Sequence, residues 1–510
     1  MHLKEIVTSK GEVLLYTGEP RIELLDELAA GPGDLWHSSL DQGFRGAFPE
    51  LVYQTAVFWW FLNDVNQIQR SINWRINPQS FVIRKTVWEI YEGLSGEYHS
   101  NTAAALDFGY RLLRHGGGVP LYIEGLFSQA QNVVALSAND RYRFYRKNFK
   151  WDHCLYMLLK KSASNFRSEI KAFRASGKEN LSTNSTPIVA VRGLDPLTNN
   201  PEVSVVIPTM SRQKYTLQLL NDYRDQTYSV KEIIVVDATP SENWEPEVYK
   251  EDYPFDLIVH RQKSKGSCRG RNEALNFCTG DYIIFADDDI RILPDFVENH
   301  LRFLQTYSAD ACTGLDVHAD NHEFDLKDLK KALDRMGENR WKAGAAQNFN
   351  NANSCVKKEW VDKMTGNDIN FDGGYGEDTD FGFRILKMGG ILLYNPYSAN
   401  LHLKPPAGGY RDWGLQASVL GKQRKKQAWE LDHPVRFIRP VPSPTILYGI
   451  IKHYKTRQVK EYRSKYFFLY LFKGSKKMFL LRLLKLPYKQ LQFNRSLFYA
   501  RNLIKLGERF

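Results

Sequence analysis

The sequence contains few cysteines for its length. Five cysteines occur among 510 residues, and no two of them form a Cys-x-x-Cys pair. An odd number of widely spaced thiols argues against a disulfide framework and against a zinc module, and it fits a reducing compartment. We therefore expect a cytoplasmic protein. The five residues are Cys154, Cys268, Cys278, Cys312 and Cys355.

Long apolar runs are also absent. A helix that spans a bilayer needs about 20 apolar residues, but the longest uninterrupted apolar stretch of the C-terminal tail is 466–472. The first residues, Met1 to Glu5, contain no apolar core of a signal peptide. The sequence therefore predicts neither a membrane-spanning helix nor a signal peptide.

Acidic residues are scarce at the C-terminal end. Residues 451–510 contain 16 Lys and Arg but only 2 Asp and Glu, so this tail alone exceeds the net charge of the whole chain, which is +11. A charge concentrated in one segment indicates a local anionic partner rather than general nucleic-acid binding. No nucleic-acid-binding motif accompanies it, so we expect no nucleic-acid partner.

The tail combines its cations with aromatic residues and leucines, as in 466–470 and 479–486. Basic amphipathic helices of this composition lie in the interface of anionic membranes. Residues 440–510 are therefore predicted to bind a membrane surface, which would place the protein peripherally on the inner face of the cell membrane. The alternative is a helical tail that packs on the rest of the protein and exposes a solvated basic face.

The chain is too long for one hydrophobic core, and its length predicts about two to four domains. The composition, with 43% hydrophobic and 25% charged residues, is that of a globular protein. Four regions are predicted: an N-terminal domain (1–135), a helical connector and linker (136–200), an α/β domain (201–430) and a basic amphipathic helical region (431–510).

From residue 203 onward, short apolar runs alternate with helical spacing. Continuous apolar strands separated by helices predict a doubly wound, mostly parallel sheet. Ligands bind at the carboxyl ends of the strands in such sheets, and Pro208, Asp237 and the run 287–289 all lie at such ends. The predicted strands are 203–207, 232–237, 256–260 and 282–286, and the predicted helices include 214–224 and 270–278.

Three adjacent carboxylates, Asp287, Asp288 and Asp289, follow the fourth predicted strand. They repel one another, and placing them at the end of a buried strand is costly unless a cation or hydrogen-bond donors balance them. A divalent ion that bridges carboxylate and diphosphate oxygens is one solution, and Mg²⁺ or Mn²⁺ suits such ligands. The alternative is an acidic loop that caps the helix near Pro294.

Six segments between residues 203 and 411 together resemble the family 2 glycosyltransferases, which have the GT-A fold. Their order and spacing match the family, and they span about two-fifths of the chain. The segments are VSVVIPTMSR (203–212), QTYSVKEIIVVD (226–237), GSCRGRNEALNFCTGDYIIFADDD (266–289), NNANSCVKKEW (350–360), GGYGEDTDFGFRILKMGG (373–390) and LHLKPPAGGYR (401–411).

The resemblance implies a nucleotide-sugar donor, and several residues match the donor site. Pro208 and Thr209 would lie under the nucleotide, and Asp237 near the base or ribose. The family often has a second acid after that aspartate, where this sequence has Ala238. This departure leaves the nucleotide base open, although UDP is the expected carrier.

Three arginines are candidate partners of the donor diphosphate, because guanidinium groups pair well with phosphate oxygens. Arg269 and Arg271 precede and begin a predicted helix, and Arg411 ends a glycine-rich stretch that resembles a mobile lid over the donor. The alternative for Arg269 and Arg271 is a solvated surface position.

The resemblance also implies a metal site. Asp287 and Asp289 frame the Asp-x-Asp motif of the family, Asp288 lies between them near the donor, and His402 matches the third metal ligand. The expected cofactor is Mn²⁺ or Mg²⁺.

Gly376-Glu377-Asp378 resembles the acidic motif whose aspartate is the general base of the family. An acceptor hydroxyl must lose a proton as it attacks the anomeric carbon, and a single base implies inversion there. Glu377 would support Asp378, although both residues could instead cap the following helix. Asn353 and Ser354 match positions that contact the donor sugar or the acceptor.

An internal repeat links the two halves of the sequence. Residues 107–117 (DFGYRLLRHGG) and 380–390 (DFGFRILKMGG) agree at seven of eleven positions. Two unrelated helices with glycine caps would be the simple alternative. If the repeat is real, Ala104 and Ala105 replace the catalytic pair, and residues 1–135 form a degenerate transferase-like domain that serves as scaffold, positions the acceptor or mediates a homodimer.

The predicted function is transfer of a sugar from a nucleotide-diphosphate donor to a hydroxyl of a growing, lipid-linked surface glycan. One alternative is a nucleotidyltransferase that makes a nucleotide sugar, but the residues after the first strand, 208–212, lack its glycine-rich loop. Another is a glycan-binding scaffold without activity, which the acidic motifs disfavour for 203–411. The donor sugar, acceptor and linkage are not readable from spacing.

Overall fold

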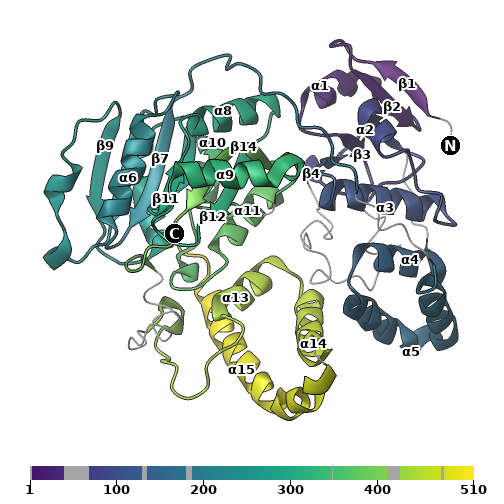
Figure 1. Cartoon of the computed structure of the whole chain (residues 1–510). Helices are drawn as coiled ribbons and strands as arrows, with labels where there is room; N and C mark the ends of the chain where they lie inside the picture. Colours follow the sequence, from purple (N-terminus) through teal and green to yellow (C-terminus); the bar gives the residue numbers. More distant parts are fainter. Residues whose placement is uncertain are drawn as a thin grey trace.

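The computed structural model describes residues 3–39, 68–128, 135–179, 186–346, 348–410, 426–472 and 476–510. Two mixed sheets flanked by helices form one side of the molecule, and the C-terminal helices extend from it (Figure 1). The predicted α/β class with a helical C-terminal region is confirmed. Among the helices described, none is long and apolar enough to cross a membrane.

The larger sheet has eight strands in the order β9-β8-β7-β10-β13-β12-β14-β11. Strands β7 and β8 are buried along their whole length, which explains their continuous apolar sequences. Four of the strand pairs are parallel, and β13 runs antiparallel to both of its neighbours. The bounds are β7 (Val203–Thr209), β8 (Glu232–Asp237), β9 (Asp256–Arg261), β10 (Tyr282–Ala286), β11 (Ile290–Ile292), β12 (Ala311–His318), β13 (Asn353–Lys357) and β14 (Leu392–His402).

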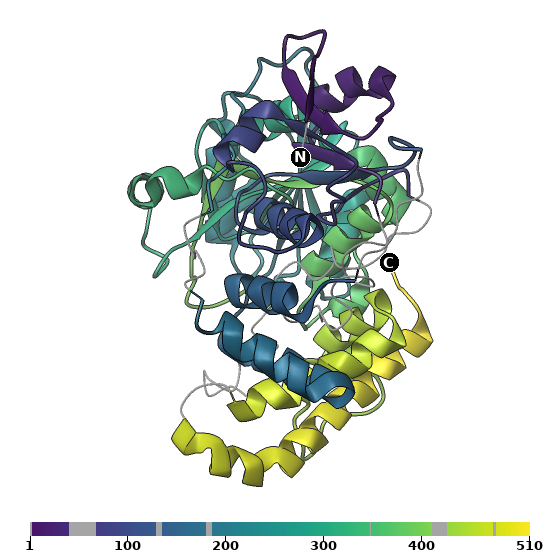
Figure 2. The same ribbon diagram turned by 90° about the vertical axis from the view of Figure 1, so that its right-hand side faces the viewer.

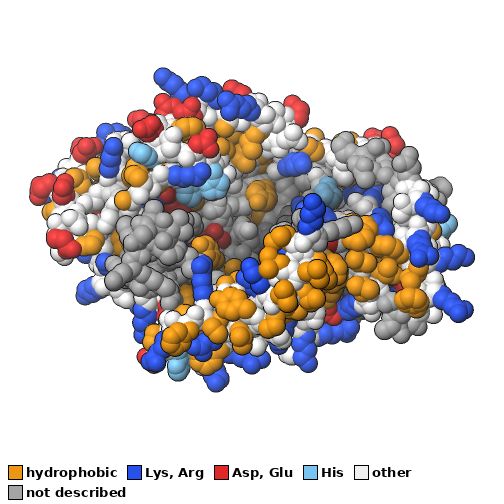
Figure 3. All heavy atoms as spheres, turned by 60° about the horizontal axis from the view of Figure 1, so that its bottom comes forward, with side chains coloured by type: hydrophobic (Ala, Val, Ile, Leu, Met, Phe, Trp, Pro, Cys, Tyr) orange, Lys and Arg blue, Asp and Glu red, His pale blue; other side chains and the backbone are white. Residues whose placement is uncertain are grey.

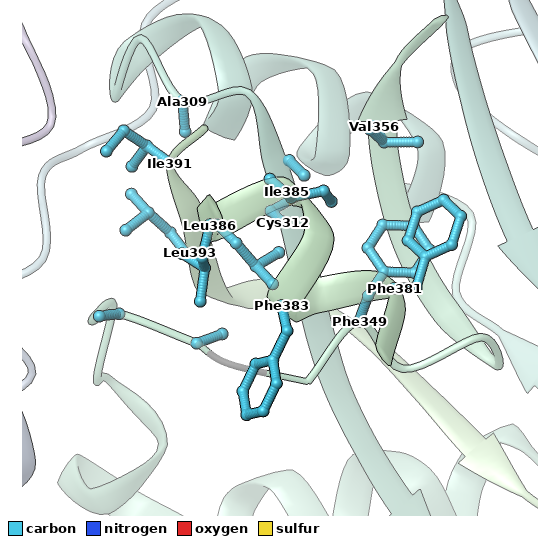
Figure 4. Packing of buried hydrophobic residues seen from close by; sticks show 14 of the residues in the cluster. Ala309, Cys312, Phe349, Val356, Phe381, Phe383, Ile385, Leu386, Ile391 and Leu393 are labelled. Atoms are coloured by element: carbon cyan, nitrogen blue, oxygen red, sulfur yellow. The ribbon is translucent and has the colours of Figure 1, made fainter. Parts of the chain in front are cut away.

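Helices connect these strands and cover the sheet. Helix α11 carries the Glu-Asp pair in its first turn, and its apolar side chains pack against strand β14 and the segment before it (Figure 4). Burial of each such side chain contributes about 1.5–3 kcal/mol, so the helix is held firmly over the sheet. The bounds are α6 (Gln213–Arg224), α7 (Ser267–Leu275), α8 (Phe296–Thr306), α9 (Leu326–Met336), α10 (Lys358–Met364) and α11 (Glu377–Lys387).

The smaller sheet belongs to the N-terminal region and has the strand order β1-β2-β5-β3-β6-β4. Its strands are β1 (Lys4–Val7), β2 (Val13–Thr17), β3 (Leu35–His37), β4 (Arg70–Ile72), β5 (Phe81–Arg84) and β6 (Pro120–Ile123), and its helices are α1 (Leu25–Ala30), α2 (Lys85–Ile90) and α3 (Asn101–Arg114). The sequence of this region offers five aromatic residues that could either stack on sugar rings or form a core: Trp36, His37, Trp59, Trp60 and Trp74. Trp36, His37 and Trp74 are fully buried and are therefore core residues. Trp59 and Trp60 lie outside the described residues.

The two sheets share a pattern of strand pairing. Strand β3 pairs antiparallel with β5 and parallel with β6, as β12 does with β13 and β14. The two sheets also pair equivalent residues. Equivalence here means that residues 107–117 are aligned with 380–390 and that the first copy has one extra glycine, Gly118. The facing residues are Leu35, Ile83 and Pro120 in the smaller sheet, and Ala311, Val356 and Leu392 in the larger one.

Side-chain contacts repeat as well. Asp34 and Asp310 precede the equivalent strands, and each accepts a backbone N–H at 2.8 Å from the residue before the parallel partner strand, Val119 or Ile391. Both helices of the repeat contain an aspartate bonded to an arginine four residues later, at 2.7 Å in α3 and 2.9 Å in α11. The smaller sheet has no counterpart of β7, β8 and β9 among its described strands.

Residues 186–200 were predicted as part of a linker, and they form an extended strap between the two sheets. The Tyr397 hydroxyl donates to the Arg192 carbonyl at 2.8 Å, and the Arg192 guanidinium lies 4.8 Å from the ring of Tyr307. The same guanidinium donates to the Gly31 carbonyl at 2.8 Å. Because this strap contacts both the N-terminal region and the larger domain, it links the two.

The remaining helices form two groups, α4 (Ala138–Asn148) with α5 (Trp151–Ser176), and α13 (Pro444–His453), α14 (Thr456–Phe472) and α15 (Phe479–Leu506). Figure 2 shows α5 beside the C-terminal helices, and the Tyr156 hydroxyl donates to Glu461 at 3.0 Å between α5 and α14. Helix α13 reaches the larger domain, where His453 and Lys452 lie 2.8 and 2.7 Å from Asp380 of α11. The tail is therefore docked at both ends.

Candidate active site

A cavity of about 1040 Å³ opens at the carboxyl ends of strands β7, β10 and β12. Figure 3 shows the hollow, with acidic and histidine side chains on its wall. Parallel strands bring these side chains together because their ends meet at one edge of the sheet. The charged and histidine side chains of the wall include Arg212, Arg271, Asp287, Asp288, Asp289, Asp316, His318, Glu377, Asp378 and His402.

Arg271 projects from helix α7 into the wall of this cavity and is only 4% exposed. One guanidinium nitrogen donates to Asp287 at 2.6 Å. The other two nitrogens, Nε and Nη1, have no hydrogen-bond partner among the described residues. A buried guanidinium with unused donors is costly, so this position favours an anionic ligand with several oxygens.

Besides Arg271, two groups balance the carboxylates after β10. Arg212 Nη1 lies 2.6 Å from Asp289 and 3.1 Å from Asp288, and His402 Nε2 lies 3.2 Å from Asp289. Burial raises the pKa of Asp288 to about 7, although Arg212 and the Thr209 hydroxyl, which donates to Asp288 at 2.7 Å, oppose that rise. Burial alone would lower the pKa of His402, but its hydrogen bonds to two carboxylates raise it to about 11.

Asp287, Asp289 and His402 offer donor atoms that lie within 4.8 Å of one another. Two carboxylates and one imidazole form a donor set that suits Mn²⁺, and they leave coordination positions for the oxygens of a diphosphate. The predicted metal residues therefore fit the predicted ion in chemistry and in spacing. Ligation requires the imidazole of His402 to be neutral at Nε2.

Asp378 lines the same cavity at the start of helix α11. Burial raises the pKa of its carboxyl to about 8, and the neighbouring Glu377 carboxylate adds to the rise. The side-chain amide of Asn351 donates to Asp378 Oδ1 at 2.5 Å and orients it. Gly376, with φ +110°, provides the left-handed turn that starts the helix at this point. A carboxyl group with a pKa near neutral is suited to proton transfer.

Asn353 and Ser354 do not line the cavity, so the predicted sugar or acceptor contact at these residues is corrected. Both side chains lie inside the sheet because β13 begins at Asn353. The amide of Asn353 bonds to His300 at 2.9 Å and to Asn400 at 2.7 Å. The preceding loop faces the cavity instead, through residues 350–352.

The other predicted donor residues are distributed around the cavity. Pro208 lines it, whereas Asp237 lies behind it, where the Tyr249 hydroxyl donates to its carboxylate at 3.1 Å. Arg269 is turned away, donates to the Ser264 hydroxyl at 2.6 Å and does not line the cavity. Arg411 lies outside the described residues.

The residues of the cavity wall that sequence reasoning missed include Arg212, Asp316, His318 and Asn351. Arg212 follows the first strand of the larger sheet, so its place at a strand end could have indicated a role. Asp316 and His318 lie within strand β12, which carries no recognisable motif. Asn351 reaches Asp378 only through the fold.

Comparison with known proteins finds relatives of the larger domain. Residues 204–364 match the model of the family described as glycosyl transferase family 2. The putative colanic acid biosynthesis glycosyl transferase WcaA of Escherichia coli (strain K12) is 32% identical over 99 residues, which are 19% of this chain and 36% of that protein. Chondroitin synthase of Pasteurella multocida is 24% identical over 251 residues, 42% of this chain and 26% of that protein.

A solved structure of the mannosyltransferase PcManGT from Pyrobaculum calidifontis, in complex with GDP-Man and Mn²⁺, is 18% identical and covers 60% of this chain and 87% of that chain, with a TM-score of 0.34. Residues 204–364 are thus similar to the family 2 glycosyltransferases, as the sequence predicted, and the two curated relatives are bacterial proteins. The match covers 36% of the length of the Escherichia coli protein and 26% of the length of chondroitin synthase, so the chain spans only part of these relatives.

Proposed function

We propose that this protein is an inverting, metal-dependent glycosyltransferase that moves a sugar from a nucleotide-diphosphate donor, expected to be UDP-linked, to a hydroxyl of a growing glycan. The observation that carries the proposal is the shared cavity, where Asp378 and the metal-ligand group line the wall with Arg271. A base and an anion-binding group in one cavity are what sugar transfer from a diphosphate requires.

The chain's residues divide the reaction between them. Pro208 lies at the nucleotide end of the donor, Thr209 and Asp237 support that wall from behind, and Arg271 holds the diphosphate. The acceptor oxygen forms a bond to the anomeric carbon while its proton passes to Asp378, and the bond from that carbon to the diphosphate oxygen breaks.

Asp287, Asp289 and His402 would hold Mn²⁺ or Mg²⁺, which neutralises the charge of the departing diphosphate. Glu377 beside the base keeps the pKa of Asp378 high, and Asn351 fixes its orientation. Attack from the side opposite the diphosphate inverts the configuration.

A screen of nucleotide sugars by thermal unfolding tests this proposal. A ligand that binds only the native state raises the melting temperature, so one nucleoside diphosphate sugar with Mn²⁺ should raise it and the others should not. The proposal fails if no nucleoside diphosphate sugar shifts the melting temperature at millimolar concentration. Stabilisation by a nucleoside triphosphate with a sugar phosphate would instead support a nucleotidyltransferase.

Replacing Arg271 by methionine should raise the KM for the donor about 10- to 100-fold, because a charge-assisted hydrogen bond to an anion contributes about 1.5–3 kcal/mol. Arg269→Met is the matched control, since Arg269 begins the same helix but is turned to Ser264. Its KM should stay within about threefold, because the Arg269 guanidinium is engaged by Ser264 and by Asp372, 3.5 Å away, and does not line the cavity. Equal effects of the two substitutions would contradict the assignment.

The proposed acceptor is lipid-linked, and the C-terminal helices supply the surface that would bring the protein to it. Leu480 and Leu484 at the start of α15 are 71% and 79% exposed. Leu483, Tyr488 and Leu491 on the same helix are also exposed, beside Arg482, Lys485 and Lys489. Figure 3 shows hydrophobic and basic side chains on the same face as the hollow, an arrangement that suits peripheral binding to an anionic membrane.

The double substitution Leu480→Glu with Leu484→Glu should reduce binding to vesicles of phosphatidylcholine and phosphatidylglycerol by at least about 100-fold, because each leucine that leaves the interface loses about 1.5–3 kcal/mol. Val7→Glu with Ile22→Glu, two exposed apolar residues of the N-terminal region, should leave cosedimentation with the vesicles unchanged. If the protein with Leu480→Glu and Leu484→Glu still binds the vesicles, these leucines do not lie in the membrane interface.

The N-terminal domain is proposed as a copy of the acceptor half of the transferase without its chemistry. Its strand pairing and helix contacts match those of the larger sheet, and Ala104 and Ala105 stand at the positions of Glu377 and Asp378. With no base and no described nucleotide-binding strands, its role is that of a scaffold for the active domain, for a second copy of the chain or for the acceptor.

A further inference from the structure

Two groups of possible metal ligands share His402. The first is Asp287, Asp289 and His402, and the second is Asp316, His318 and His402. The first group contacts the imidazole at Nε2, which lies 3.2 Å from Asp289. The second contacts Nδ1, which lies 3.3 Å from Asp316. A neutral imidazole has one nitrogen with a lone pair and one with a proton, so only one of the two groups can use it as a ligand.

We infer that Asp316 is not a metal ligand but a positioning residue for His402. Its carboxylate accepts a hydrogen bond from the Nδ1–H of His402. The proton therefore stays on Nδ1, and the lone pair of Nε2 is directed at the metal position beside Asp287 and Asp289. A histidine ligand whose second nitrogen donates to a carboxylate is held in one tautomer and one ring orientation, and it is a stronger base for the metal. The inference rests on the metal site of the proposed function.

The surroundings of Asp316 suit this role. Asn400 donates to its Oδ1 at 2.8 Å, and Asn350 donates to its Oδ2 at 3.1 Å. The Asn400 amide is held in turn by Asn353, which bonds to His300 in the core. A chain of buried polar groups therefore runs from the core to the imidazole, and it fixes the direction of the Asp316 carboxylate.

Strand geometry places Asp316 beside His402. Strands β12 and β14 pair in parallel, with Asp316 opposite Asn400 and His318 opposite His402. The register shifts between Gly314 and Leu315, and such irregularities re-aim side chains next to active sites. Without the shift, a different residue of β14 would face Asp316.

His318 does not fit as a ligand of the shared imidazole. Its ring stacks on that of His402, with centroids 5.1 Å apart and planes 28° from parallel. Imidazole nitrogens bind metals in the plane of the ring, and stacked rings do not direct their lone pairs to one point. His318 is also 64% exposed in its side chain, and its Nε2 lies 3.7 Å from Asp316.

Titration of the full chain with Mn²⁺, followed by electron paramagnetic resonance of the free ion, tests the inference. Asp316→Ala should raise the dissociation constant for Mn²⁺ about 10- to 100-fold, the usual effect of removing such a partner. Asp316→Asn keeps an oxygen that accepts the Nδ1 proton, so its constant should stay within about threefold of the unmodified protein. His318→Ala should leave the constant unchanged, and melting temperatures confirm that each variant is folded.

The outcomes separate the possible errors. If Asp316→Asn weakens Mn²⁺ binding as much as Asp316→Ala, the carboxylate acts by its charge and the positioning role is wrong. If His318→Ala weakens binding as much as Asp316→Ala, the second group is the metal site. Asp289→Ala tests the proposed function itself, because unchanged Mn²⁺ binding in that variant removes the metal site on which the inference rests.

Discussion

Replacing Asp378 by asparagine should lower the rate of sugar transfer about 10²- to 10⁴-fold, the contribution of a general base. The substitution keeps the size of the side chain and the contact with Asn351 but removes the proton acceptor. Donor binding should change little, since Arg271 and a metal ion held by the acidic residues after β10 would bind the diphosphate. The measurement is kcat and KM of the variant with the donor that the thermal screen identifies.

Glu377→Gln provides the comparison for Asp378→Asn. Glu377 raises the pKa of Asp378 through its charge, so Glu377→Gln should lower the pKa of Asp378 in the pH profile. The rate should fall far less than in Asp378→Asn. Full transfer activity in Asp378→Asn would show that another group takes the proton.

The raised pKa of Asp378 predicts two pH effects. Only the deprotonated carboxylate accepts a proton, so kcat/KM should rise with pH and level off above the pKa of about 8. The folded-state pKa exceeds the ordinary value of 3.8, so the folded state loses stability as pH rises between these two values. Asp378→Asn removes that loss, and its gain in melting temperature should therefore be larger at pH 8.5 than at pH 5.

Replacing Asp289 by alanine should abolish detectable transfer, a loss of at least about 10³-fold. The reason is that a metal ion stabilises the negative charge of the departing diphosphate by several kcal/mol. Asp289 bonds to both His402 and Arg212, so the substitution also releases two cations of the site. Chelation of the protein with EDTA should produce the same loss, and Mn²⁺ should restore activity to the chelated protein but not to the variant.

Asp295→Asn serves as the control for Asp289→Ala. Asp295 is an acidic residue close in sequence, and it does not line the cavity. It should retain activity and the same dependence on Mn²⁺. Transfer that persists after chelation in the unmodified protein would show that the acidic group acts without a metal.

Much of the larger domain could be predicted from the sequence because its signals are local. Continuous apolar runs predicted β7, β8 and β10, and parallel pairing required that their ends share one edge. Chain direction and pairing therefore placed Pro208, Asp237 and the run 287–289 at one edge of the sheet. Asp378 and His402 were assigned to the same site through the resemblance to the family 2 glycosyltransferases.

The contacts that orient the site could not be predicted. Asp316 reaches His402 only because of the register shift within β12 and β14, and nothing in the sequence marks that shift. The predicted role of Asn353 was wrong because a strand begins at that residue and turns its amide toward His300. Side-chain direction at a strand boundary depends on pairing with neighbours that are distant in sequence.

The similarity between the two sheets extends further than the sequence indicated. Only residues 107–117 and 380–390 are alike enough to recognise, yet the pairing pattern includes β2, whose register against β5 equals that of β10 against β13. Backbone pairing tolerates almost any apolar side chain, whereas the aspartate and arginine of the helices must keep a specific contact. Four of the seven identical positions are therefore those of the ion pair and the two glycines that end the helix.

The most direct measurement is the product formed from nucleotide sugars in the presence of Mn²⁺. The unmodified chain should release a nucleoside diphosphate from one nucleotide sugar, slowly with water as acceptor and faster with a lipid-linked glycan. Asp378→Asn and Asp289→Ala should each release less than about 1% as much, since each loses at least 10²-fold in rate. Two results would contradict a glycosyltransferase at this site: release of pyrophosphate from a nucleoside triphosphate and a sugar 1-phosphate, or activity in the two variants equal to that of the unmodified chain.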